Sequence, residues 1–126
     1  MPCQYVIDAD QRLVITTGWG RLTFYEAKAH QAQLLSDAAF NPEYDQLLDL
    51  TAVSGLDMTA DQAETLASRV VFSARSRRAL VATDPVVFGM GRLMEAHHEL
   101  ATRREQTRVF RDREAALDWI RSKPRS

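Results

Sequence analysis

Hydrophobic and polar positions recur with different periods along the chain, and the changes of period divide it into strands and helices. Residues 4–8 and 12–19 are two short β-rich runs, and the second alternates in the two-residue period of a strand. Three residues separate the runs, which is a spacing typical of a β-hairpin. We therefore expect two paired strands at the start of the fold.

Three later segments have the character of strands. Residues 45–51 (DQLLDLT) form an apolar run of the kind expected when both faces of a strand are covered. Residues 77–84 (RRALVATD) predict another buried strand, and residues 107–112 (TRVFRD) predict a last one.

Four helices are expected after the second, third, fourth and fifth strands, and each has a recognisable start. The start signals are Thr23 with Glu26, Thr59 with Gln62, Asp84 with Pro85, and Asp112. Pro42 ends the first helix. The predicted inward stripes are Ala27, Gln31, Leu34, Leu35 and Ala38; Ala63, Leu66, Ala67, Val70 and Ala74; Phe88 or Met90 with Leu93, Met94, His97 and Ala101; and Ala115, Ala116, Trp119 and Ile120.

The predicted order of elements is ββαβαβαβα. A hairpin followed by alternating helices and strands implies an α/β fold with a mixed sheet, in which the later strands are largely parallel. No linker, low-complexity tract or internal repeat interrupts the pattern. We expect residues 1–126 to form a single domain.

Composition narrows the class of protein. The chain is 45% hydrophobic and 26% charged, which is typical of a soluble globular domain. No apolar run approaches the length of about 20 residues that spans a membrane, and no secretory signal is evident. Cys3 is the only cysteine, so an internal disulfide and a multi-cysteine metal site are both excluded. A cytoplasmic location is the resulting expectation.

Charge is distributed unevenly along the sequence. Residues 1–68 hold three cations and ten acids, a net charge of −7, whereas residues 69–126 hold thirteen cations and seven acids, a net charge of +6. Salt bridges within the chain or across a dimer interface would account for this division, and so would an anionic partner.

Several motifs that suggest chemistry do not meet its requirements. His97 and His98 are adjacent, so on a regular helix they point about 100° apart and cannot chelate one metal ion. Gly89 and Gly91 lack the strand-to-helix position of a dinucleotide-binding loop, and would instead admit close packing or open a shallow groove. Arg92 beside them would face either an anionic ligand or solvent.

No catalytic constellation or cofactor site is recognised, so the chain is not expected to be an enzyme. Ser54 and Ser68 lack the context of an activated nucleophile, and Cys3 lies near the terminus. The arginine-rich segments carry one interleaved aromatic residue, Phe110, which does not provide the stacking platforms of a nucleic-acid site. Neither a metal nor nucleic acid is expected as a partner.

The order of elements resembles that of the STAS family of anti-sigma factor antagonists and transporter regulatory domains. More closely, the chain resembles the small stand-alone bacterial proteins called SpoIIAA-like or STAS/SEC14-like. The residues that carry the resemblance are LVITTGWGRLTFYEA (13–27), FNPEYDQLLDLTAV (40–53), ALVATDPVVFGMGRL (79–93) and VFRDREAALDWI (109–120). The resemblance implies a SpoIIAA-like mixed sheet with about four helices.

The resemblance also implies a site for protein partners. In the antagonists a serine at the start of a helix is phosphorylated, where free amides and the helix dipole favour phosphate. Asp57 matches the aspartate before that serine, Met58 falls on the serine itself and Thr59 follows, although a shift of one residue would place Thr59 on the acceptor. Met58 would either make an apolar contact with a partner or cover the core.

Two functions of different classes follow. The first is a non-enzymatic regulatory domain that docks a protein partner through Asp57, Met58, Thr59 and Asp61, without the serine switch. The second is a carrier or sensor of a small apolar or anionic ligand, as the SEC14-like resemblance implies, with a pocket lined by Trp19, Phe88, Met90, Arg92 and Met94. An enzyme with a composite site ranks third. Homodimerisation through a strand edge or a helix face is a further expectation.

Overall fold

The computed structural model describes residues 3–69, 71–102 and 106–122. Its elements follow the predicted order ββαβαβαβα, which is confirmed. Their bounds are β1 (Cys3–Asp8), β2 (Leu13–Thr23), α1 (Phe24–Ser36), β3 (Asp45–Asp57), α2 (Ala60–Ser68), β4 (Arg78–Val81), α3 (Pro85–Thr102), β5 (Thr107–Phe110) and α4 (Arg113–Arg121).

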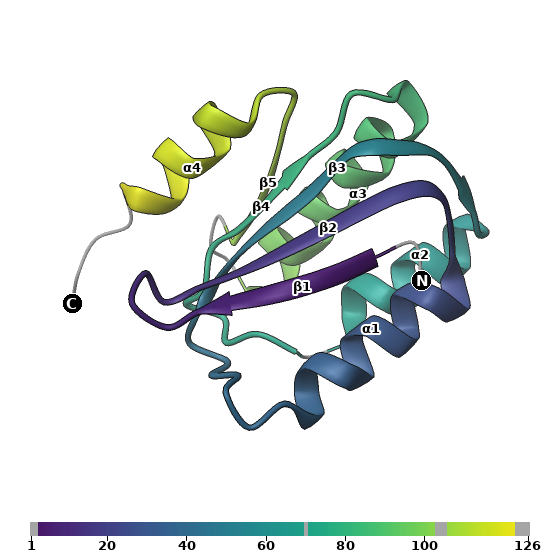
Figure 1. Ribbon diagram of the computed structural model, residues 1–126. Helices are drawn as coiled ribbons and strands as arrows, with labels where there is room; N and C mark the ends of the chain where they lie inside the picture. Colours follow the sequence, from purple (N-terminus) through teal and green to yellow (C-terminus); the bar gives the residue numbers. More distant parts are fainter. Residues whose placement is uncertain (1–2, 70, 103–105, 123–126) are drawn as a thin grey trace.

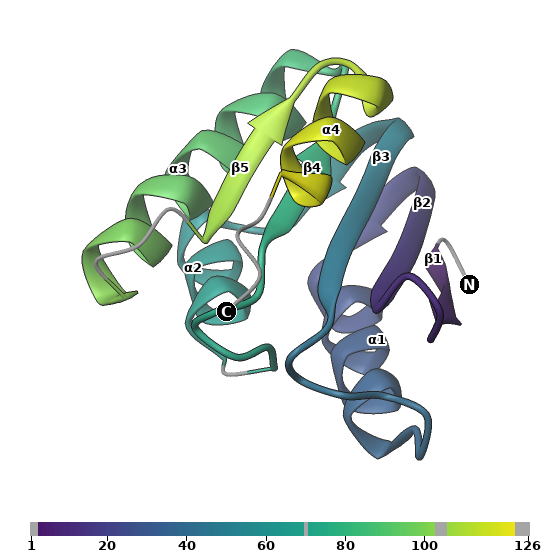
Figure 2. The same ribbon diagram turned by 90° about the vertical axis from the view of Figure 1, so that its left-hand side faces the viewer.

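The strands form one five-stranded sheet in the order β1-β2-β3-β4-β5. β1 runs antiparallel to β2, and every later pair of neighbours is parallel, so both the hairpin and the mixed sheet are confirmed. Arg12 closes the hairpin with a positive φ of 54°. Helices α1, α2 and α3 lie over one face of the sheet and α4 lies over the other (Figures 1 and 2).

The α4 face of the sheet is tightly packed. Leu47, Ala79 and Val81 have no exposed surface, and they pack against the inward side of α4. Ala116, Trp119 and Ile120 are buried there, as the predicted stripe of the last helix requires, whereas Ala115 is exposed. Apolar side chains on alternate positions of β3 and β4 therefore divide between two separate layers.

The second and third strands are longer than predicted. β3 continues to Asp57, where a loop was expected, and β2 continues to Thr23. The two strands pair along this extension, with Leu22 opposite Leu56, so each satisfies the backbone hydrogen bonds of the other.

The helix after β3 is shorter than its predicted stripe. α2 ends at Ser68, so the assignment of Ala74 to it was wrong, and Val70 lies outside the described residues. Buried Val71 and Phe72 follow the helix in irregular structure and supply the apolar surface that the periodicity had assigned to a further turn.

The buried face of α3 is rotated from the predicted one. Val87, Gly91 and His98 face the protein, whereas Leu93 is 62% exposed. A Cβ atom on Gly91 would lie 2.8 Å from Val109 Cγ2, so the glycine allows α3 to approach β5 closely. Phe88 and Met94 of the predicted stripe do pack against the core. The prediction was wrong for Leu93, because it treated apolar side chains, and not the small glycine, as the packed positions.

Ion pairs connect the acidic and basic halves of the sequence. Arg113 Nη1 at the start of α4 lies 2.7 Å from Asp49 Oδ2 in β3, and Arg75 Nη2 lies 3.7 Å from Glu43 Oε1. Burial alone would raise the pKa of Asp49, but hydrogen bonds from Thr51 and Arg113 hold it below its ordinary value. Intramolecular pairing thus accounts for part of the charge division.

The predicted homodimer stays a prediction, but the described residues include exposed apolar surface. Val86, Leu93 and Leu100 are 64%, 62% and 83% exposed and recur every seven residues along α3. Since seven residues make about two turns of a helix, the three side chains lie on one line.

Candidate functional site

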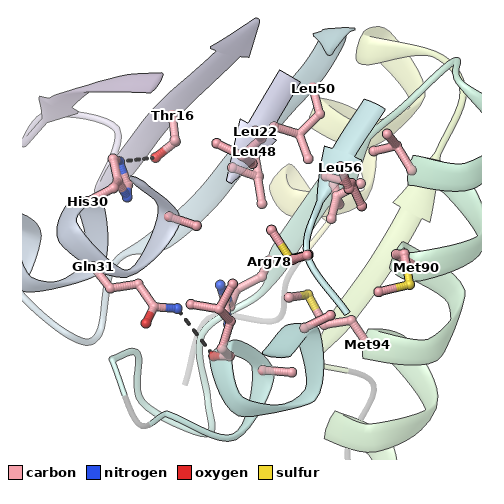
Figure 3. Close-up of a pocket in the computed structure, with 18 of the residues that line it drawn as sticks. Thr16, Leu22, His30, Gln31, Leu48, Leu50, Leu56, Arg78, Met90 and Met94 are labelled. Atoms are coloured by element: carbon pink, nitrogen blue, oxygen red, sulfur yellow. Dashed lines mark hydrogen bonds between the residues drawn. The ribbon is translucent and has the colours of Figure 1, made fainter. Parts of the chain in front are cut away.

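A cavity of about 360 Å³ lies between the sheet and the helices α1, α2 and α3 (Figure 3). Leucines of the strands form one wall, among them Leu22, Leu48, Leu50 and Leu56. The volume falls within the range of about 300–1,000 Å³ that is usual for small-molecule sites.

Small side chains on the helices explain why this space is not filled. The helix surfaces that border the cavity carry Ala27 of α1, Ala63 and Ala67 of α2, and Gly91 of α3. Gly91 is in close contact with β5, so the unfilled space lies beside the alanines. Protein interiors are normally close-packed, and small side chains on α1 and α2 leave a volume that the leucines of the sheet do not occupy.

Methionine side chains form the part of the wall near β3 and α3. Met58 follows β3, and Met90 and Met94 lie one turn apart on α3; all three line the cavity. Methionine is flexible and polarizable, so this wall can adapt to apolar groups of different shape.

A chain of four polar side chains crosses the floor of the cavity. Arg78 Nε donates to Gln46 Oε1 at 3.1 Å, and Gln46 Nε2 donates to Thr16 Oγ1 at 3.0 Å. The Thr16 hydroxyl lies 3.4 Å from His30 Nε2 (Figure 3). Arginine can only donate hydrogen bonds, so the side-chain oxygen of Gln46 faces Arg78 and its NH2 group faces Thr16. The Thr16 hydroxyl accepts from Gln46 and can therefore donate its own proton to His30.

Charge on this floor is concentrated on Arg78. Burial lowers the pKa of Arg78 to about 10, so the guanidinium stays protonated at neutral pH. Burial, and then the positive charge of Arg78, lower the pKa of His30, which is therefore neutral at that pH and can accept the Thr16 proton. The floor thus carries one positive charge.

No carboxylate among the described residues forms an ion pair with Arg78; carboxylates of these residues pair instead with other arginines, as in Arg21 with Asp57, Arg75 with Glu43 and Arg113 with Asp49. The guanidinium carbon lies 5.1 Å from the centroid of the Phe72 ring, which supports the side chain from one side. A cation enclosed by protein is costly unless it is compensated, so its position on a cavity wall is unusual.

The cavity opens to solvent at one side. Ala60 and Glu64 of α2 and Leu93 of α3 belong to its lining and are exposed, whereas Thr16, Gln46 and Leu80 on the sheet are buried. A small molecule can therefore enter between α2 and α3 and reach the polar floor.

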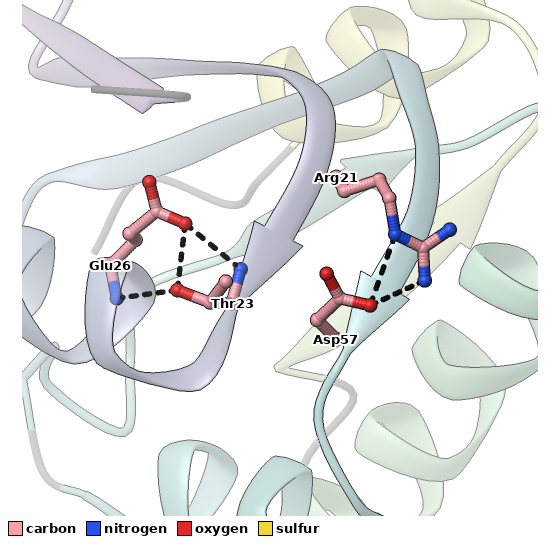
Figure 4. A network of polar contacts seen from close by, with 4 residues as sticks. All are labelled: Arg21, Thr23, Glu26 and Asp57. Carbon is pink, nitrogen blue, oxygen red and sulfur yellow. Dashed lines mark hydrogen bonds and ion pairs between the residues drawn. The ribbon is translucent and has the colours of Figure 1, made fainter.

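The residues predicted to dock a partner lie beside this cavity but do not act as one group. Asp57 is bound by the guanidinium of Arg21 across the paired ends of β2 and β3, with Arg21 Nε 3.0 Å from Asp57 Oδ1 (Figure 4). This hydrogen bond lowers the pKa of Asp57. Figure 4 also shows the capping box of α1, in which Glu26 N donates to Thr23 Oγ1 at 3.2 Å.

The other three docking residues have different surroundings. Thr59 Oγ1 accepts from Gln62 N at 3.1 Å, so the predicted capping box is confirmed. Asp61 is exposed in the first turn of α2. Met58 is half-buried, packs against the core and lines the cavity, so its side chain covers the interior as well as facing a ligand site.

Only some of the residues that were predicted to bind a ligand line the cavity. Met90 and Met94 line the cavity, whereas Trp19, Phe88 and Arg92 are not part of its lining. Trp19 is 39% exposed and Arg92 is exposed. The centroid of the Phe88 ring lies 4.0 Å from the guanidinium carbon of Arg111.

The polar floor was missed in the sequence. Gln46 and Arg78 each lie within a segment predicted as a buried strand, and a polar residue in such a run is a signal that was available. The burial of His98 was also missed: its Nε2 lies 2.7 Å from Ala67 O. His97, which was placed on the predicted inward stripe, is half-buried and lines the cavity.

Metal sites and membrane-spanning helices were two features that the sequence did not predict. The described residues contain no group of three or more histidine, cysteine, aspartate or glutamate side chains placed to hold a metal ion. None of the described helices is long and apolar enough to cross a membrane.

Comparison with solved structures decides the fold. The chain resembles the crystal structure of an uncharacterised DUF3478-family protein from Shewanella loihica, reported with a SpoIIAA-like fold, at a TM-score of 0.60. The likeness covers 94% of this chain and 93% of that one. This chain has a SpoIIAA-like fold. The predicted resemblance is thus confirmed, and at 22% sequence identity the SpoIIAA-like fold is what the likeness shows.

Comparisons of sequence add no further relative. No protein-family model matches the chain, and no curated protein matches it. The function of this SpoIIAA-like domain must therefore be argued from its own cavity.

Proposed function

We propose that the protein binds a small, mainly apolar ligand in the cavity beneath α1, α2 and α3, and acts as a carrier or sensor of that ligand. The observation that carries the proposal is the cavity of about 360 Å³ with walls of leucine, methionine and alanine. Apolar cavities of this kind gain free energy when an apolar ligand replaces empty or poorly hydrated space.

The cavity limits the size of the ligand. At about 30 Å³ for each non-hydrogen atom, taken from the share of one water in the liquid, 360 Å³ holds about twelve such atoms. A linear molecule of ten to twelve non-hydrogen atoms is therefore a suitable probe.

The proposed function is binding without catalysis. Cys3 is the one cysteine of the cavity lining, and burial raises the pKa of its thiol, which keeps it protonated at neutral pH. His30 is engaged with Thr16 at the other end of the polar chain.

Methionine methyl groups provide a direct test. Met58, Met90 and Met94 line the cavity, and Met1 is the remaining methionine of the chain. On titration of 13C-methyl-methionine protein with 1-decanol, we expect the three cavity resonances to shift along one saturable curve. Their failure to shift at the solubility limit of decanol would contradict the proposal.

Docking of a protein partner through residues 57–61 is a second candidate function. The exposed carboxylate of Asp61 and the half-exposed side chain of Asp57, 48% accessible, lie together where β3 ends and α2 begins. Two neighbouring carboxylates on the surface support an electrostatic contact with a protein partner. Met58 is not part of this proposed contact, because its side chain lines the cavity.

Charge reversal at Asp61 tests the docking function. We expect Asp61→Lys to abolish retention of a partner in affinity capture from native lysate, while lowering the free energy of unfolding by no more than about 1 kcal/mol through the helix dipole. Asp10→Lys makes the same change of charge at an exposed position of the hairpin turn and serves as control. Equal capture by the wild-type protein and both variants would reject this site.

A further inference from the structure

We propose that the ligand of this cavity is an apolar chain with a single carboxylate, and that Arg78 binds the carboxylate at the floor of the cavity. The inference rests on the proposed binding function and adds the chemical class of the ligand. It is argued from the hydrogen-bonding capacity of Arg78, the geometry around it and the charge of the lining.

Arg78 has unused donors that face a ligand site. A guanidinium has five N–H donors, and among the described residues only Gln46 accepts from it, through Nε. The two terminal nitrogens thus have no described acceptor, and Arg78 retains accessible surface as part of the cavity lining. Two parallel N–H donors match the two oxygens of a carboxylate, and such charge-assisted, bidentate hydrogen bonds are among the strong ones in proteins.

The surroundings hold the guanidinium in place before a ligand arrives. Gln46 fixes the Nε end, and its own amide is held by Thr16, which is backed by His30. The Phe72 ring restricts movement on another side. Because the side chain is already ordered, little conformational entropy is lost when a carboxylate binds.

The charge of the lining favours a carboxylate over a phosphate. Among the described residues that line the cavity, Arg78 is the one arginine or lysine, and neutral His30 adds no charge. The carboxylate of Glu64 also belongs to the lining, but it is exposed to solvent at the mouth. A phosphate monoester carries about −1.5 to −2 charges at pH 7 and would leave negative charge uncompensated in an apolar site. A carboxylate carries one negative charge and is fully balanced.

The apolar walls determine the rest of the ligand. Leucines of β2 and β3 and the methionines of α3 continue from the polar floor, and they offer no further charged partner to a second head group. The single carboxylate at Arg78 therefore continues as a hydrocarbon chain. Decanoate has about the twelve non-hydrogen atoms that the volume admits, and 1-decanol is its neutral counterpart.

The test compares these two probes by isothermal titration calorimetry at pH 7, below their solubility and micelle limits. We expect wild-type protein to bind decanoate at least about tenfold more tightly than 1-decanol, as charge-assisted hydrogen bonds would provide. Arg78→Met, which keeps an unbranched apolar side chain, should lose this preference: decanoate affinity falls at least about tenfold while decanol affinity is unchanged within about twofold.

Each result decides between the two claims. Binding of decanol but no preference for decanoate in the wild type, or equal decanoate affinity in Arg78→Met, overturns the carboxylate assignment and leaves the proposed function standing. Binding of neither probe overturns both. If Arg78→Met does not fold, Arg78→Lys is the second variant, because lysine keeps the positive charge but lacks the two parallel N–H donors of the guanidinium. We expect Arg78→Lys to weaken the binding of decanoate and to leave the binding of decanol unchanged. An unchanged affinity for decanoate in this variant would also overturn the assignment.

Discussion

Leu47→Ala is expected to lower the free energy of unfolding by about 2–5 kcal/mol, whereas Leu48→Ala should lower it by only about 1 kcal/mol. The two leucines are neighbours on β3 and face opposite sides of the sheet. Leu47 has no exposed surface and packs beneath α4, so its truncation creates a new void. Leu48 already borders the cavity, so its truncation enlarges an existing space and removes fewer contacts.

Urea denaturation of the two variants and the wild-type protein measures this difference. The strand and the chemical change are the same at both positions, so a difference in the loss of stability reports how the two faces of the sheet are packed. Equal losses of stability would mean that the α1–α3 side of the sheet is as well packed as the α4 side, and the cavity would then be absent in solution.

Ala63→Trp is expected to weaken the binding of 1-decanol at least about tenfold, which corresponds to about 1.4 kcal/mol. Ala63 is half-buried on α2 and lines the cavity, so an indole at this position occupies the volume that the ligand requires. Since the indole fills space that is otherwise empty, the melting temperature should not fall, which separates loss of the site from loss of the fold.

A matched control comes from the exposed side of α3. Ala96 is exposed and is not part of the cavity lining, so Ala96→Trp adds the same side chain without entering the site. The methionine methyl titration should show the wild-type curve for this variant. A wild-type curve for Ala63→Trp, or loss of binding in Ala96→Trp, would place the decanol site elsewhere.

The elements of the fold were predictable because their signals are local. The capping boxes of Thr23 and Thr59 lie within four residues of sequence, and the structure contains both. The stripe Ala116, Trp119 and Ile120 is likewise contained in two helical turns. Pattern and capping therefore gave the order of strands and helices and, with the resemblance, the SpoIIAA-like fold.

The cavity was not predictable because it depends on relations between distant segments. The contact of Arg78 with Gln46 follows from the register of β3 and β4, in which these two residues are paired neighbours. No pattern in either segment specifies that register. The empty volume is lined by Ala27 of α1 and Ala63 of α2, which are far apart in the sequence. A hydrophobic stripe marks an alanine as a core position but does not show whether neighbouring side chains fill the space beside it.

The position of the α3 face illustrates the same limit. The hydrophobic periodicity predicted that Leu93 faces the core. In the structure, the close contact at Gly91 orients α3 so that Val87 and His98 are buried, and Leu93 lies at the mouth of the cavity. A glycine contributes nothing to a hydrophobic stripe, although here it determines the orientation of the helix. The methionines that line the cavity were named from their chemistry, and their placement required the structure.

The most direct test of the central claim is a crystal structure of the protein grown with decanoate. The predicted result is one decanoate between the sheet and α1, α2 and α3, with its carboxylate about 2.8 Å from the terminal nitrogens of Arg78 and its chain against Met90 and Met94. A cavity closed by the protein's own side chains, with decanoate absent or bound only on the outer surface, would contradict the account.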